Sequence, residues 1–232
     1  MSTIIRYNPF NQIHKGLRAL LYDTAIKLQH TDFKDESAAA SCFDRINTVL
    51  WLFDSHADIE DNMVFPLVKK VAHQVVKDFE KEHYADHQLG NDLRNALQSY
   101  YFANDEDAKF KTGTNVLIAF NEFIAFNLSH MNREETIINT LLWENYSDDV
   151  LMGVTKAIVA KIPQNKNELY SRWMLKGIGM HEIIDWAKSI KATAPQFVFE
   201  QFCFMAEEEL PFEKWIVLKT VLGIEDRSEV AA

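Results

Sequence analysis

The sequence predicts an all-α protein. Apolar residues recur at helical spacing in four long segments, at about residues 9–30, 38–72, 75–102 and 116–142. The 232 residues include only 7 glycines and 5 prolines, too few turn-formers for the many short strands of a β-sandwich or barrel. Because short polar breaks separate the segments, we predict an up-down antiparallel four-helix bundle followed by a C-terminal helical extension.

Local signals mark the ends of the four segments. Asn8 and Pro9 suit the cap and first turn of the first helix, and the polar stretch 31–37 ends it. Pro66 lies inside the second segment and predicts a kink there. The stretch 104–113 predicts the turn between the third and fourth helices. The turn between the second and third helices has neither glycine nor proline to mark it.

From residue 147 onward the pattern changes to shorter helices: Pro163 ends the first, Gly177 ends the second, and Pro195 begins a later one. The chain is therefore predicted to divide into a bundle at residues 1–145 and an extension at residues 146–232. The extension is rich in Trp, Phe and Met, so it is expected to pack against another surface. A lid over the bundle and a homodimer interface are both compatible with this content.

Composition restricts the partners and the compartment. A formal charge of -10 disfavours nucleic acid and anionic membrane surfaces, because both repel an acidic protein. The most apolar stretch, residues 116–126, is too short to span a bilayer, and the first residues show no secretory signal. Cys42 and Cys203 are expected to be reduced, buried side chains. A cytoplasmic protein is the expectation.

Histidines and glutamates occur in pairs at helical spacing. His56 and Glu60, His83 and His87, and His130 and Glu134 are each four residues apart, which places the two members of a pair on one helix face. The first segment adds His14, on its inner face or at the edge of that face. The candidate metal ligands are therefore His14, His56, Glu60, His83, His87, His130 and Glu134.

The positions of these residues agree with an antiparallel bundle. Ligands that face each other require turns midway between successive ligand positions. These midpoints fall near residues 36, 71 and 108, and two of them lie inside the polar breaks already described. The third falls where no composition signal marks a turn.

The expected burial of the glutamates points to a metal. Glu60 and Glu134 lie on apolar stripes, where an unpaired carboxylate is costly to bury. Histidines with carboxylates suit iron, with manganese or zinc possible by substitution, better than calcium or magnesium, which prefer oxygen ligands. A ferritin-like carboxylate site would need Glu-x-x-His pairs and more glutamates, so it fits less well.

Residues 8–142 resemble the hemerythrin-like, or HHE cation-binding, proteins. The resemblance rests on the segments FNQIHKGLR, HADIEDNMVFP, EHYADH and HMNREE. Glu134 follows His130 by four residues, whereas the oxygen-carrying hemerythrins place an Asp five residues after the last histidine. At this point the chain is more similar to the iron-centre repair proteins and to the iron-sensing domain of an F-box protein.

The resemblance implies a non-haem centre of two iron ions with an oxo or hydroxo bridge. It assigns His83, His87 and His130 to one iron and His14 and His56 to the other, with Glu60 and Glu134 bridging. The iron with two histidines would then keep a vacant position for dioxygen, nitric oxide or peroxide. The leading hypothesis is a protein that binds or senses dioxygen. The alternatives are an enzyme that handles peroxide or nitric oxide, and an iron-responsive interaction module.

Overall fold

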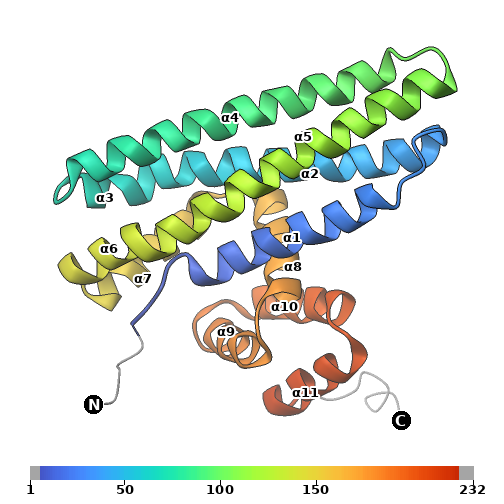
Figure 1. Ribbon diagram of the computed structural model, residues 1–232. Helices are drawn as coiled ribbons and strands as arrows, with labels where there is room; N and C mark the ends of the chain where they lie inside the picture. Colours follow the sequence, from blue (N-terminus) through green and yellow to red (C-terminus); the bar gives the residue numbers. More distant parts are fainter. Residues whose placement is uncertain (1–5, 225–232) are drawn as a thin grey trace, which may run out of the picture.

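The structure, a computed structural model, describes residues 6–224 and contains helices and no strand within that range. Four helical rods lie side by side along the length of the molecule and alternate in direction (Figure 1). The rods are α1 (Asn11–Gln29), α2 (Glu36–Ile59) continued by η1 (Glu60–Val64) and α3 (Phe65–Lys69), α4 (His73–Tyr101), and α5 (Glu106–Arg133) continued by η2 (Glu134–Ile138) and α6 (Asn139–Asn145). The predicted all-α bundle is confirmed.

The turn that composition could not locate lies between α3 and α4, at residues 70–72, where the ligand positions predicted it. The predicted break at 104–113 was too long, because α5 already begins at Glu106. The Asp105 carboxylate accepts a hydrogen bond from the Ala108 backbone N–H at 2.8 Å and caps the helix. Gly113 lies within α5, and a Cβ atom there would overlap the Phe33 side chain. This glycine allows close packing and does not end the helix.

Both rods that carry a His-x3-Glu pair contain a π-helical turn. η1 begins at Glu60 and η2 begins at Glu134, and in each turn the backbone N–H five residues later bonds to the glutamate carbonyl. Single π-turns inside α-helices are frequent at functional sites. Pro66 follows η1, so the distortion lies just before the proline that predicted a kink. No proline follows η2, and the residues after it are Asn139 and Thr140.

Two apolar clusters fill the bundle. One contains Leu17, Phe53, Leu93 and Phe123, and the other contains Phe10, Phe65, Phe79 and Ile138. Along each rod, residues of one cluster precede the candidate ligands in the chain and residues of the other cluster follow them. The polar site is therefore enclosed between two apolar layers.

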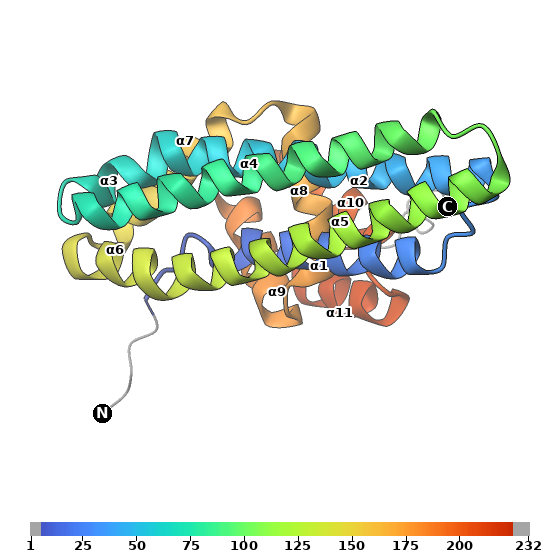
Figure 2. The ribbon, with the colours of Figure 1, turned by 45° about the horizontal axis from the view of Figure 1, so that its top comes forward.

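The extension consists of α7 (Asp148–Lys161), α8 (Gln164–Gly177), α9 (Met180–Thr193), α10 (Gln196–Glu209) and α11 (Phe212–Leu222). Pro163, Pro195 and Pro211 stand at the N-caps of α8, α10 and α11. Figure 2 shows α8 crossing the bundle, with α9 and α11 beyond α1. None of the helices at residues 6–224 is both long and apolar enough to cross a bilayer.

Glycines bring α8 into close contact with α1. A Cβ atom on Gly177 would overlap the Lys15 carbonyl, and one on Gly16 would lie 2.8 Å from the Met174 backbone nitrogen. Tyr170 of α8 is buried and donates its hydroxyl hydrogen to the Leu52 carbonyl at 2.6 Å. α8 thus shares the bundle core, while α9, α10 and α11 pack in a separate apolar cluster that also includes Leu175 from the end of α8. The division after residue 145 stays a prediction.

Candidate metal centre

Six of the seven candidate ligands meet in the middle of the bundle. They form two overlapping groups, and within each group the potential ligand atoms lie within 4.8 Å of one another. One group is His14, His56, Glu60 and Glu134, and the other is Glu60, His83, His130 and Glu134. All six side chains are buried, and His56 is the most exposed at 8%.

The four histidines form two pairs. The Nε2 atoms of His14 and His56 are 3.1 Å apart. The Nε2 atoms of His83 and His130 are also 3.1 Å apart. Imidazole nitrogens at this distance converge on a common point, as expected for two ligands of one metal ion.

Each glutamate presents one oxygen to each histidine pair. Glu60 Oε1 lies 3.1 Å from His56 Nε2, and Glu60 Oε2 lies 3.5 Å from His83 Nε2. Glu134 Oε2 lies 3.5 Å from His14 Nε2, and Glu134 Oε1 lies 3.3 Å from His130 Nε2. Both carboxylates are therefore placed between the two pairs.

Carboxylates outside the cluster orient three of the histidines. The Nδ1 atom lies 2.9 Å from Glu135 in His14, 2.8 Å from Asp61 in His83 and 2.8 Å from Glu82 in His130. A carboxylate on the second ring nitrogen fixes the tautomer and turns Nε2 inward, as in many metal sites.

These orienting carboxylates were not among the residues predicted from the sequence. A signal was present, since Asp61 and Glu135 directly follow the glutamates of the cluster and Glu82 directly precedes His83. Arg18 pairs with Glu135 at 2.8 Å, and Arg133 pairs with Glu82. These arginines hold the orienting groups and leave the inner carboxylates unpaired.

His87 does not join the cluster. Its Nδ1 atom lies 3.2 Å from Asp54 Oδ1, and its side chain is 39% exposed. Asp54 also pairs with Arg94, so His87 is part of a surface network. His87 was predicted to lie with the other six candidate ligands, but in the structure it lies beside Asp54.

The spacing of the buried face of α4 explains the position of His87. Buried positions on this helix follow one another at alternating steps of three and four residues, as in a coiled-coil seam: Val76, Phe79, His83, Asp86, Gly90, Leu93, Leu97 and Tyr100. The position that follows His83 on the buried face is Asp86, whose carboxylate accepts a hydrogen bond from Asn127 Nδ2 at 2.6 Å. A step of four from His83 therefore leads away from the core.

The inner carboxylates have no hydrogen-bond donor within the described residues. All four oxygens of Glu60 and Glu134 are buried and unsatisfied. Burial and the neighbouring Glu60 carboxylate both raise the pKa of Glu134. Burial would also raise the pKa of Glu60, but His56, His14 and His83 hold it well below its usual value. Buried carboxylates normally need a partner, and a bound cation would supply it, so this donor set fits a metal.

The fold and the site define a four-helix-bundle protein with buried His/Glu groups that could hold metal ions. The sequence model of the hemerythrin HHE cation-binding domain matches residues 7–142, more than half of the chain. The chain therefore belongs to the hemerythrin HHE cation-binding family, as the resemblance predicted. Comparisons with curated proteins and with solved structures returned no match.

Metal affinity is expected to rise with pH. Burial would lower the pKa of His83, but Asp61 and Glu60 outweigh it and raise the pKa to about 10, so the metal-free protein holds a proton there at neutral pH. An imidazole must lose this proton to bind a metal. Titration with Zn²⁺ in weak buffer at pH 7 should therefore release protons, and affinity should increase from pH 6 to pH 8. Binding without proton release, at a pH-independent affinity, would contradict this electrostatic description.

Proposed function

We propose that the cluster holds two iron ions, one at each histidine pair. The observation that carries this proposal is that Glu60 and Glu134 each direct one oxygen toward each pair. Each ion would receive two imidazoles and two carboxylate oxygens. The resemblance implied three histidines on one iron, and the position of His87 favours this symmetric set instead.

The chemical nature of the donors favours iron. Imidazole and carboxylate together suit iron, zinc and manganese, whereas calcium and magnesium prefer shells of oxygen. Iron is proposed because the expected ligand is dioxygen, and ferrous ions supply the electrons needed to bind it. Manganese and zinc are the expected substitutes.

We propose that the physiological role is to bind or sense dioxygen. Four protein donors on each ion leave room for a small ligand. Aromatic rings surround the histidines: the Phe65 ring stacks on His83 with centroids 5.1 Å apart, and Phe10 lies 5.1 Å from His14. Phe79 and Phe126 flank His130. On these sides of the cluster the aromatic rings limit the access of water, which favours reversible binding over release of reduced oxygen.

Anaerobic loading with ferrous iron tests this function. We expect about two irons per chain and an absorption band that appears in air and disappears when oxygen is removed. Repeated turnover with peroxide or nitric oxide, without a stable oxygen form, would favour the enzymatic alternative. Loss of helicity on chelation, with no oxygen-dependent spectrum, would favour an iron-responsive interaction module. One iron or fewer per chain would contradict the two-iron proposal.

A further inference from the structure

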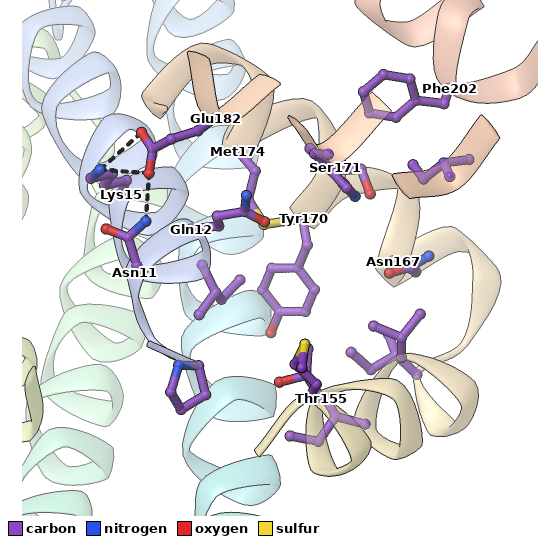
Figure 3. A pocket seen from close by; sticks show the side chains of 18 of the residues that line it. Asn11, Gln12, Lys15, Thr155, Asn167, Tyr170, Ser171, Met174, Glu182 and Phe202 are labelled. Carbon is purple, nitrogen blue, oxygen red and sulfur yellow. Dashed lines mark hydrogen bonds and ion pairs between the residues drawn. The ribbon is translucent and has the colours of Figure 1, made fainter. Parts of the chain in front are cut away.

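A large cavity lies between the bundle and the extension. Its volume is about 1790 Å³, which exceeds the roughly 300–1,000 Å³ of most small-molecule sites. Its walls come from α1, the α2–η1 segment and helices α7 to α10, and Figure 3 shows side chains from several of these elements turned into it. The extension therefore builds a chamber on the side of the bundle.

The cavity reaches the candidate metal centre. His56, Ile59 and Glu60 are part of its wall, together with Phe10 and Ile13, which precede His14 in the chain. Access from this cavity accounts for the position of His56 as the most exposed residue of the cluster, at 8%. The other histidine pair does not line the cavity. An organic molecule in the chamber would thus contact one half of the centre.

The Arg and Lys side chains of the wall, Arg6 and Lys15, are already paired. Arg6 donates to Asp148 at 2.7 Å and to two backbone carbonyls of the segment that follows η2. The Lys15 ammonium contacts both oxygens of Glu182, at 2.8 and 2.9 Å. Figure 3 shows the Lys15–Glu182 pair at one edge of the chamber. Neither cation is available to a carboxylate or phosphate group of a ligand.

The remaining wall is mainly apolar, with neutral polar groups and the carboxylates of Glu168, Asp185 and Glu200. Aliphatic, Met and aromatic side chains come from both the bundle and the extension, and include Ile13, Met152, Ile162, Met174, Trp186 and Phe202. The side-chain amides of Gln12 and Asn167 line the cavity and make no hydrogen bond to another described residue. They can donate to or accept from a neutral oxygen or nitrogen atom.

We propose that this chamber binds an uncharged, largely apolar organic molecule that carries a neutral hydrogen-bonding group and contacts the His56–Glu60 side of the centre. Dioxygen alone would not need a cavity of this size or the amides in its wall. The contact with bound metal rests on the proposed function. Binding in the chamber does not rest on it, since the walls are built by the protein alone.

Fluorescence of the neutral probe N-phenyl-1-naphthylamine tests the proposal in the full-length, metal-free protein. We expect saturable binding that 1-decanol displaces at lower concentration than decanoate does. Thr155→Trp fills the chamber from the α7 wall and should weaken probe binding at least tenfold, as should Gln12→Trp from the α1 wall. Thr140→Trp is the matched control, because Thr140 is exposed and makes the same bond to the carbonyl four residues earlier.

The outcomes separate this proposal from the proposed function. In Co²⁺-loaded protein, the proton resonances of bound 1-decanol should broaden relative to Zn²⁺-loaded protein, and Thr155→Trp should abolish the effect. Saturable binding to metal-free protein without this broadening would overturn the contact with the centre. Three results would overturn the chamber as a site for uncharged molecules. These are the absence of saturable probe binding, binding to folded Thr155→Trp and Gln12→Trp that is as strong as to the wild-type protein, and displacement of the probe by decanoate at lower concentration than by 1-decanol. Failure of iron loading alone would affect only the proposed function.

Discussion

Glu134→Ala is expected to remove nearly all bound iron, from about two ions per chain to well below one. Its two oxygens face different histidine pairs, so its loss takes one donor from each ion. Glu60→Ala should behave in the same way for the same reason. His83 belongs to only one of the two ligand groups, so His83→Ala should leave about one ion per chain. Iron measured after anaerobic loading and gel filtration checks these values.

His87→Ala is the informative control for this experiment. Its family-implied role as a ligand predicts loss of one iron, whereas its observed pairing with Asp54 at 3.2 Å predicts that both irons remain. Retention of about two ions in His87→Ala, with loss in His83→Ala, would support the symmetric arrangement. Equal loss in both variants would mean that His87 binds metal and that the symmetric set is wrong.

Metal removal is expected to lower the melting temperature by about 10–20 °C. A site whose free metal concentration is about 100 times its Kd adds ~2.7 kcal/mol of stability, so two sites add about 5 kcal/mol. A domain of this size shifts by about 2–4 °C per kcal/mol. The metal ions would also supply partners for the four unsatisfied oxygens of Glu60 and Glu134. Thermal unfolding followed by circular dichroism, with and without chelator, measures the shift.

Replacing Glu134 with neutral glutamine should change the melting temperature in opposite directions in the metal-free and the metal-loaded protein. In the metal-free protein Glu134→Gln removes a buried carboxyl group whose charged form is opposed by burial and by Glu60, so the melting temperature should rise. In the metal-loaded protein the same variant should lower it, because a charged ligand is lost. A decrease of similar size in both states would show that Glu134 acts through packing and not through charge.

Much of the bundle could be predicted because the signals are local. Apolar spacing located the four rods, Pro163 marked the end of α7, and Pro195 marked the start of α10. The pairs His56–Glu60 and His130–Glu134 identified the chemistry, since residues four apart share a helix face. Errors came where a local signal was ambiguous: Gly113 suggested a break, but it provides space for Phe33 across the bundle.

The sequence by itself determined the helical class, the family and the types of ligand, because helix periodicity and side-chain chemistry are properties of neighbouring residues. Only the tertiary structure decided which ligands meet. The alternating steps along α4 turn Asp86 inward and leave His87 beside Asp54. The orienting carboxylates and the chamber between bundle and extension likewise depend on how helices distant in sequence pack. The path of the extension across α1 is fixed by contacts such as Gly177 against Lys15, which no local pattern encodes.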